Sequence, residues 1–233
     1  MPSILITGAS RGFGSELLDV YAGHGWTIFP LVRDHRVAIE LGQIYPANCF
    51  PIVGDVSLDS VESAVERVLA DHTESLDVLV NNAGHVVKNR GVLAASSAEL
   101  IEHFNVHCVG AWRCVRVCLP YLRRSERPVV VNITSRFGSI GELGNQAMTS
   151  IYAYNIAKCA QNMLSACLDK ELVESGIRVL PVHPGRLKTA AAAYDADTLP
   201  REAAVKLFDW IASIDESTPC EMYDLMRGQR LPW

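Results

Sequence analysis

Short apolar runs alternate along the chain with longer stretches in which apolar residues recur every three or four positions. Six of the runs have the length and β-branched content of buried strands, and a weaker one near the C-terminus predicts a seventh. The runs span residues 3–7, 27–32, 49–53, 76–80, 129–135, 177–182 and 220–226. Because strands that alternate with helices pair in parallel, the pattern predicts an α/β fold: a doubly wound parallel sheet of about seven strands with helices on both faces.

Two local signals refine this pattern. The longest helical stretch, 96–124, begins with Ser96 or Ser97 as N-cap, and Glu99 is placed for a capping box. Pro30 interrupts the second apolar run. Because proline donates no backbone hydrogen bond, we expect a local bulge in that strand.

The composition sets the class of protein. With 233 residues and 49% hydrophobic content, the chain can bury one large core, so residues 1–233 are predicted to form a single domain. The net charge of -5 argues against a nucleic-acid or acidic-membrane surface. The chain has no run of about 18 apolar residues, and its N-terminus leads directly into the first predicted strand. We therefore expect a cytoplasmic protein without a membrane segment.

The seven cysteines form no Cys-x-x-Cys pair, and most lie in apolar helical or strand-like contexts. Cysteines of this kind are typically reduced and buried. We therefore expect neither disulfides nor cysteine-bound metal, and no metal site is predicted.

A glycine-rich turn joins the first predicted strand to the first predicted helix. Its sequence is Gly8-Ala9-Ser10-Arg11-Gly12-Phe13-Gly14. Glycines allow a tight turn and a close backbone approach, and the first N–H groups of the following helix attract a phosphate. Because the turn lies between a strand and a helix at the start of the alternating pattern, it predicts a dinucleotide site.

The end of the second strand indicates which dinucleotide binds. An acidic residue there holds the ribose 2'-hydroxyl of NAD, whereas an arginine accommodates the 2'-phosphate of NADP. Val32 and Arg33 occupy this end, and Arg11 lies within the glycine turn. We therefore expect NADP(H) to be preferred. The alternative is that Arg11, Arg33 and Arg36 are ordinary surface charges.

Tyr154 and Lys158 stand four residues apart near the start of a predicted helix that ends at Gly176. On a helix the two side chains share one face. A tyrosine hydroxyl has an ordinary pKa of about 10, and a nearby ammonium favours its ionised form. This spacing alone is common on solvated helix faces. The hydroxyl of Ser135, at the end of the fifth predicted strand, adds a second polar group where a ligand crevice is expected.

The order of the motifs is more specific than any one of them. The motifs are Thr7-Gly-x-x-x-Gly-x-Gly14, Asp55-Val56, Asn81-Asn-Ala-Gly84, Ser135, Tyr154-x-x-x-Lys158 and Pro184-Gly185 followed by Thr189. Over nearly the whole chain this order resembles the short-chain dehydrogenase/reductase family, and most of all its small C-factor or sniffer-type carbonyl reductases. The resemblance implies a Rossmann-type fold, NADP(H) as cofactor, and hydride transfer between nicotinamide and a carbonyl or alcohol carbon of a small organic substrate.

The resemblance also implies roles for individual residues. Tyr154 is expected to be the general acid/base, Ser135 to hydrogen-bond the reacting oxygen, and Lys158 to bind the nicotinamide ribose and lower the pKa of Tyr154. These roles fit the chemistry, because hydride delivery to a carbonyl builds negative charge on oxygen. The residues expected to bind the cofactor are Gly8, Ser10, Arg11, Gly12, Phe13, Gly14, Arg33, Asp55, Val56, Asn81, Ala83, Gly84, Tyr154, Lys158, Pro184, Gly185 and Thr189.

One position departs from the family pattern. Where the family places a relay asparagine three residues before a helix glycine, this chain has His107, three residues before Gly110. Asn105 could serve after a shift of two residues, but His107 lies nearer the apolar face of the helix, so we expect His107 to face the crevice. An imidazole can donate and accept, and its ordinary titration range lies near neutral pH. The alternative is a half-buried packing histidine without a catalytic part.

Two classes of function follow. The expected one is an NADP(H)-dependent carbonyl reductase or alcohol dehydrogenase. The alternative is a cofactor-holding protein with a non-redox role, such as a regulator, an isomerase or a cyclase, and it is suggested by His107 and Arg186. The resemblance further implies a homodimer or homotetramer, formed through the helices that carry Trp112 to Cys118 and Tyr154. A substrate lid is expected at about residues 186–214.

Overall fold

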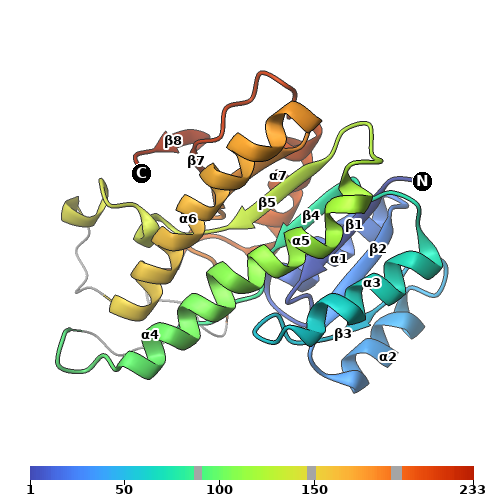
Figure 1. Ribbon diagram of the computed structural model, residues 1–233, viewed down its shortest axis with the longest axis horizontal. Coiled ribbons are helices and arrows are strands. Elements are labelled where there is room, and N and C mark those ends of the chain that lie inside the picture. The colour runs from blue at the N-terminus through green and yellow to red at the C-terminus, as the bar shows by residue number, and fades with distance from the viewer. Residues whose placement is uncertain (87–90, 146–150, 190–195) are drawn as a thin grey trace.

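The computed structural model describes residues 1–86, 91–145, 151–189 and 196–233 (Figure 1). The strands are β1 Ser3–Thr7, β2 Thr27–Val32, β3 Ile52–Val53, β4 Val78–Asn81, β5 Val129–Ile133, β6 Arg178–His183, β7 Met222–Asp224 and β8 Gln229–Leu231. The helices are α1 Phe13–Gly23, α2 His35–Ile44, α3 Ser60–His72, α4 Ser97–Phe104, α5 Gly110–Leu122, α6 Tyr152–Leu172 and α7 Pro200–Ala212. Short helical turns are η1 Asn105–Val109, η2 Arg136–Gly138, η3 Leu143–Asn145 and η4 Val173–Ser175.

The strands form one sheet in the order β3-β2-β1-β4-β5-β6-β7-β8. Neighbouring strands pair in parallel except β7 and β8, which are antiparallel. The predicted doubly wound parallel sheet is thus confirmed, with eight strands in the described residues where about seven were expected. The extra strand arises because the chain turns back at Gly228, whose φ of 64° suits glycine, and adds β8 to the edge.

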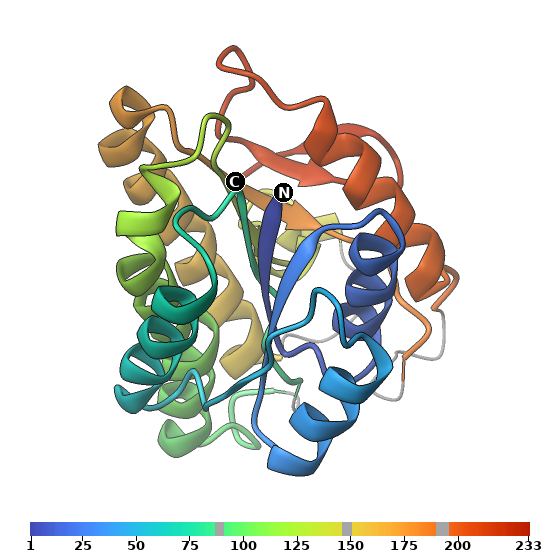
Figure 2. The same cartoon turned by 90° about the vertical axis from the view of Figure 1, so that its right-hand side faces the viewer.

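The helices cover both faces of the sheet, as Figure 2 shows. Helices α1, α2 and α7 lie on one face, and α3, α4, α5 and α6 lie on the other. No helix in the described parts of the chain is long and apolar enough to cross a membrane.

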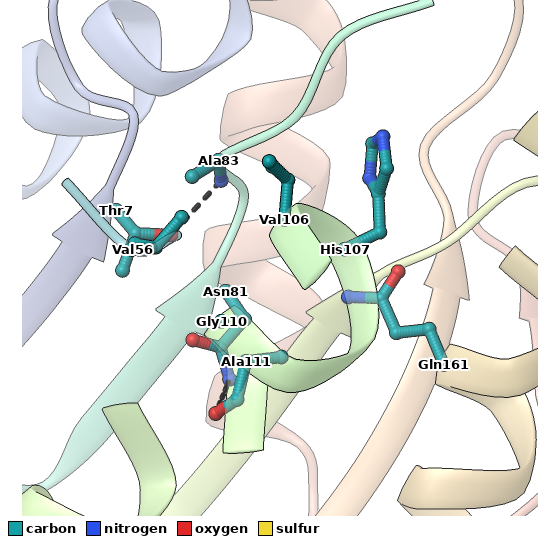
Figure 3. Close-up of a pocket in the computed structure, with 9 residues that line it drawn as sticks. All are labelled: Thr7, Val56, Asn81, Ala83, Val106, His107, Gly110, Ala111 and Gln161. Atoms are coloured by element: carbon teal, nitrogen blue, oxygen red, sulfur yellow. Dashed lines mark hydrogen bonds between the residues drawn. The ribbon is translucent and has the colours of Figure 1, made fainter. Parts of the chain in front are cut away.

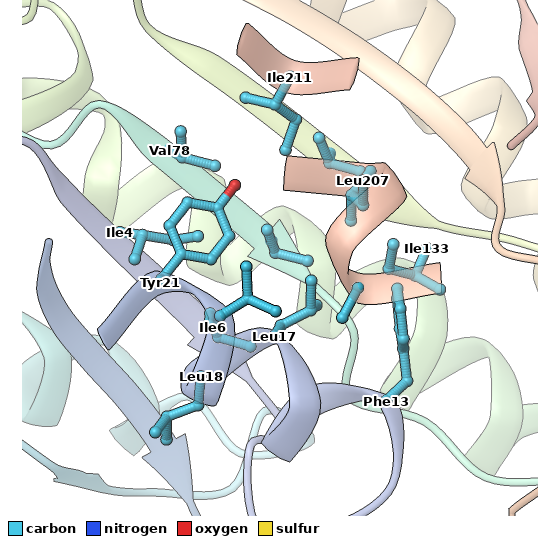
Figure 4. Packing of buried hydrophobic residues seen from close by; sticks show 14 of the residues in the cluster. Ile4, Ile6, Phe13, Leu17, Leu18, Tyr21, Val78, Ile133, Leu207 and Ile211 are labelled. Atoms are coloured by element: carbon cyan, nitrogen blue, oxygen red, sulfur yellow. The ribbon is translucent and has the colours of Figure 1, made fainter. Parts of the chain in front are cut away.

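Side-chain alternation along the strands builds a separate core on each face. In β1, Ile4 and Ile6 join the cluster under α1 and α7, whereas Leu5 joins the cluster under α3 and α5. Figure 4 shows the first of these clusters, where Tyr21 and Leu207 pack against the strand side chains. Each strand is apolar at successive positions because both of its faces are buried. All seven cysteines are free thiols, but only Cys49, Cys114 and Cys118 are buried, and Cys167 is exposed.

Pro30 produces a gap in one ladder and no bulge. The pairing of β2 with β1 is continuous from Thr27 to Leu31 and includes Pro30. On the β3 side, a bridge at Ile28 and the pairing that begins at Leu31 leave Pro30 without a partner. The predicted bulge was therefore wrong. The missing N–H of proline lies where the ladder between β2 and β3 is interrupted, so it costs no hydrogen bond there.

The predicted helix 96–124 is divided by the π-helical turn η1. The capping box at Ser96 and Glu99 is confirmed. A π-helical turn contains an extra residue, so the faces of α4 and α5 are out of register with each other. As a result His103 and His107 are buried, whereas the apolar side chain of Phe104 is 43% exposed.

Thr7 and Asn82 join the ends of β1 and β4. The Thr7 hydroxyl accepts hydrogen bonds from the backbone N–H groups of Asn82 and Ala83, both at 2.9 Å. The Asn82 side chain donates in return to the carbonyls of Thr7 at 2.9 Å and Gly8 at 3.2 Å. These bonds fix the glycine turn after β1 beside the loop after β4.

We expect Thr7→Val to lower the free energy of unfolding, because it leaves two backbone N–H groups without their acceptor at an unchanged side-chain shape. A buried group that loses its partner costs about 1–3 kcal/mol. Urea unfolding followed by circular dichroism measures the loss. Thr7→Ser keeps the hydroxyl and is the control, so equal stability of the two variants would show that the hydroxyl is not what joins the strands.

Candidate functional site

A crevice of about 1000 Å³ opens at the carboxyl ends of the parallel strands. This edge is where an open α/β sheet binds its ligands. Most of the residues that the sequence predicted for the site line it: Gly8, Ser10, Arg11, Gly12, Phe13, Arg33, Asp55, Val56, Ala83, Gly84, His107, Ser135, Tyr154, Lys158, Pro184, Gly185 and Thr189. Gly14 and Asn81 do not line the crevice.

Gly14 and Asn81 lie behind the crevice wall. A Cβ on Gly14 would lie 2.3 Å from the carbonyl oxygen of Gly8, so glycine is required there for the turn to pack on α1. The buried side chain of Asn81 donates to Asn132 Oδ1 at 2.9 Å and so links β4 to β5. Both residues shape the site without facing the space inside it.

The glycine turn leaves the N-terminus of α1 open. Gly8 and Gly12 have φ angles of 67° and 61°, which only glycine adopts readily. No side chain caps the first N–H groups of α1. These N–H groups and the positive end of the helix dipole face the crevice, and they can hold an anionic group such as a phosphate.

Two arginines border the same end of the crevice. Arg11 lies in the glycine turn, and Arg33 follows β2. Arg33 Nη1 is 4.0 Å from Asp55 Oδ2, and the Arg33 side chain is 78% exposed. A pair so exposed contributes little stability, so Arg33 remains available to a ligand.

Ser135 and Tyr154 meet at the other end of the crevice. Ser135 lies two residues after β5 and caps η2: its side chain accepts the N–H of Phe137, which fixes the hydroxyl. Tyr154, in the first turn of α6, hydrogen-bonds Ser135. Burial raises the pKa of the Tyr154 phenol above its ordinary value of 10.0, although the bond to Ser135 acts in the opposite direction.

Lys158 is buried beneath the tyrosine. Its Nζ donates to the carbonyl of Ile133 at 2.6 Å and to Gln161 Oε1 at 2.9 Å, and it lies 5.8 Å from the centre of the Tyr154 ring. Burial lowers the pKa of Lys158 to about 7. The sequence led us to expect that Lys158 lowers the pKa of Tyr154. The structure gives the opposite direction for Tyr154, because burial outweighs any help from an ammonium that is itself costly to ionise.

His107 lies against the loop after β4, as expected of a residue that faces the crevice. Its Nε2–H donates to the carbonyl of His85 at 2.9 Å, and its ring centre is 5.6 Å from that of Tyr154. A Cβ on Gly84 would come within 2.3 Å of this ring, so glycine is needed beside it. Burial and the charge of Lys158 hold the pKa of His107 well below 6.5, so it does not titrate near neutral pH as its residue type suggested.

Asn105, the other relay candidate, is held elsewhere. Its side chain donates to the carbonyl of Ser57 and accepts from Arg113 Nη1, both at 2.9 Å. These bonds tie η1 to the loop after β3. They use the Asn105 side chain for contacts with Ser57 and Arg113, and neither is a residue of the Tyr154–Lys158 group.

The sequence analysis missed Gln161, which lies beside His107 in Figure 3. Gln161 is buried and is the partner of Lys158 within the same helix. The sequence does contain an indication of this contact. Residues three apart on a helix share a face, so a glutamine three residues after Lys158 can reach its amine.

The predicted lid segment has two unlike parts. Leu187 and Thr189 line the crevice, and Arg186 pairs with Asp197 at its rim. Helix α7, in contrast, packs on α1 with Ala203 buried in the core. Residues 190–195 of this segment lie outside the described residues.

A model of the family described as short chain dehydrogenase matches residues 2–199. Among curated proteins, the chain is 33% identical to the rhamnolipids biosynthesis 3-oxoacyl-[acyl-carrier-protein] reductase of Pseudomonas aeruginosa, over 83% of this chain and 75% of that one. It is 25% identical to the NADPH-dependent pterin aldehyde reductase of Arabidopsis thaliana, over 80% and 75% of the two chains.

Solved structures are also similar. The carbonyl reductase Sniffer of Drosophila melanogaster has a TM-score of 0.87 at 27% identity, and all of both chains is covered. The NADPH-bound carbonyl reductase from chicken fatty liver has a TM-score of 0.89 at 22% identity, over 100% of this chain and 99% of that one, which shows the shared fold. The chain therefore belongs to the short-chain dehydrogenase family, a family of oxidoreductases.

Proposed function

We propose that this chain is an NADP(H)-dependent reductase of carbonyl groups in small organic molecules, with the corresponding alcohol dehydrogenation as its reverse. The proposal rests on one observation: the hydrogen-bonded pair Ser135 and Tyr154, with Lys158 beneath it, lines the same crevice as the open N-terminus of α1. A phosphate-binding end and a proton-donating end in one crevice fit a dinucleotide and a carbonyl substrate.

The residues of the crevice fit NADP(H). The uncapped first turn of α1 and the bare Gly12 backbone would bind the pyrophosphate, and Arg11 and Arg33 would face the 2'-phosphate. Pro184, Gly185 and Thr189 would border the nicotinamide, and when bound the reduced nicotinamide supplies the hydride. Lys158 would exchange one of its present acceptors for the hydroxyls of the neighbouring ribose.

Tyr154 would donate the proton. A carbonyl oxygen gains negative charge as its carbon is reduced, and the hydroxyls of Ser135 and Tyr154 would both donate hydrogen bonds to it. Burial raises the pKa of Tyr154, so the phenol is protonated at neutral pH. It can protonate the alkoxide-like oxygen because an alkoxide is a stronger base than a phenolate. The reverse reaction, alcohol oxidation, needs Tyr154 to accept a proton as the phenolate, a form that burial disfavours.

His107 would be a positioning residue that transfers no proton itself. As a neutral ring it donates to the carbonyl of His85, fills the space beside Gly84 and packs edge-on against Tyr154. It would hold the loop after β4 against the cofactor and keep water from the phenol.

The relatives support the reaction class. The names of the Pseudomonas and Arabidopsis proteins describe the reduction of a 3-oxoacyl group and of an aldehyde, and both groups contain a carbonyl. We propose no single substrate. Of the described residues in the segment after Gly185, Leu187 and Thr189 line the crevice, and neither carries a charge that would select one functional group.

The proposed reaction is tested by mixing the protein with NADPH and a panel of aldehydes, ketones and quinones while the loss of NADPH absorbance is followed. Tyr154→Phe should lower kcat by about 100-fold or more, because it removes the proton donor. Cofactor affinity measured by calorimetry should stay nearly unchanged. Tyr152→Phe, two residues away and exposed, is the control. Full turnover in Tyr154→Phe, or cofactor binding without turnover of any carbonyl, would favour the non-redox alternative.

Arg33→Ala should weaken NADPH binding by about 1.5–3 kcal/mol, because a charged hydrogen bond to the 2'-phosphate is lost. NADH carries no 2'-phosphate, so its affinity should barely change. Calorimetric titration of both cofactors measures the difference, and Arg36→Ala, an exposed residue of α2 that does not line the crevice, is the control. Equal losses for NADPH and NADH would contradict this role of Arg33.

We also propose that the chain forms a homo-oligomer through α4 and α6, which pack side by side. Exposed apolar side chains lie on both helices, among them Ile101 at 69% and Met163 at 65% exposure. The family resemblance implied an interface at Trp112 to Cys118. In that segment Cys114, Val115, Val117 and Cys118 are buried within the chain, so few of its side chains are free to contact another subunit. Exposed apolar side chains on two neighbouring helices are a feature of subunit interfaces.

Light scattering at micromolar concentration should give the mass of a dimer or a tetramer. Ile101→Lys together with Met163→Lys should lower that mass toward the monomer, because two charges would be buried in the interface. Ile39→Lys, an exposed apolar position on α2, should leave the mass unchanged. A monomeric mass for the unaltered protein would refute the oligomer.

A further inference from the structure

Three histidines cluster where the loop after β4 meets α4 and η1. They are His85, His103 and His107, and one ring nitrogen from each lies within 4.8 Å of those of the other two. His103 and His107 are 0% and 1% exposed, and they stand four residues apart across the junction of α4 and η1. We propose that this cluster binds a zinc ion.

The hydrogen bonds leave nitrogens available for a metal. The Nδ1–H of His103 donates to the carbonyl of Glu99 at 2.9 Å, and no partner contacts its buried Nε2. The Nε2–H of His107 donates to the carbonyl of His85 at 2.9 Å, and no partner contacts its buried Nδ1. A buried nitrogen lone pair without a partner is costly, and a metal ion would satisfy it.

The same bonds are those that metal-binding histidines use. Such a residue coordinates through one nitrogen and donates its other N–H to a carbonyl or a carboxylate, which fixes the ring. The carbonyls of Glu99 and His85 already supply these acceptors. His103 and His107 also stand at i and i+4, which is a known spacing of two zinc-binding histidines on a helix.

The geometry needs one adjustable residue. Zinc binds imidazole nitrogen at about 2.0 Å, so the ligand nitrogens around one ion lie roughly 3.3 Å apart. His85 can close the remaining distance, because it lies on a loop and its side chain is 40% exposed. Its Nε2 is 3.4 Å from Glu102 Oε1, so the carboxylate of Glu102 is placed to be the fourth ligand or to hold a water there.

The surroundings admit a cation. His85, Glu102 and His107 line the crevice, which gives an ion a path to the cluster. Two positive groups oppose a cation at the cluster: Lys158, which acts on His107, and Arg33, which acts on His85. The Nζ of Lys158 is held by the carbonyl of Ile133 and by Gln161. Three imidazoles without a thiolate select zinc and its neighbours over magnesium or calcium, which require oxygen ligands.

The test uses the full-length protein, cleared of metal with a chelator and titrated with Zn²⁺ against a chromophoric competitor. We expect one zinc ion per chain. X-ray absorption should give nitrogen and oxygen ligands at about 2.0 Å, without the sulfur distance of about 2.3 Å that binding to the free cysteines would give. His103→Ala should weaken binding by at least about 100-fold, since even an outer-shell change typically costs 10–100-fold.

Two further variants keep the result decisive. His85→Ala, on the half-exposed loop, should weaken binding even if His103→Ala does not fold, and circular dichroism identifies that case. His35→Ala, an exposed histidine at the start of α2, should bind zinc as the unaltered protein does. Absence of binding, a sulfur ligand shell, or equal affinity in the His85 and His35 variants would overturn the proposal. Zinc binding is measured without turnover, so the result is independent of the proposed reductase activity.

Discussion

The hydrogen bonds between the end of β1 and the loop after β4 are the constraint on which the site depends. Four hydrogen bonds join Thr7 and Gly8, at the end of the first central strand, to Asn82 and Ala83, after the second. They place the glycine turn, which leaves the helix N-terminus open, beside the loop that ends at Gly84 and contacts His107. Parallel strands have their carboxyl ends at one edge of the sheet. The hydrogen bonds between the end of β1 and the loop after β4 therefore position both ends of the crevice.

Burial governs the chemistry of the inner end. Tyr154, Lys158 and His107 lie close together, and burial favours the uncharged form of each: it raises the pKa of the phenol and lowers the pKa of the amine and of the imidazole. A protonated phenol beside a neutral imidazole is suited to giving up a proton to an oxygen that becomes negative. With its pKa lowered to about 7, Lys158 can change its charge near neutral pH, so a ligand that brings charge or hydroxyls changes the electrostatics of this end strongly.

The π-helical turn η1 connects the proposed reductase site to the proposed zinc site. By adding a residue between α4 and α5 it turns His103 and His107 inward, and it leaves Phe104 toward solvent. The His107 ring then packs edge-on against Tyr154, and the same ring belongs to the histidine cluster. π-helical turns are often found at functional sites, because the local strain is retained where it serves a purpose.

The sequence by itself determined the α/β class, the parallel sheet, the glycine turn and the pairing of Tyr154 with Lys158. These depend on local periodicity, on turn chemistry and on a spacing of four residues along one helix, all of which are written in neighbouring positions. Only the tertiary structure decided the direction of the Tyr154 pKa, the contact of Lys158 with the carbonyl of Ile133 and the approach of His85 to His103 and His107. Burial and the η1 turn set these, and both depend on contacts between segments far apart in the chain, which no local pattern records.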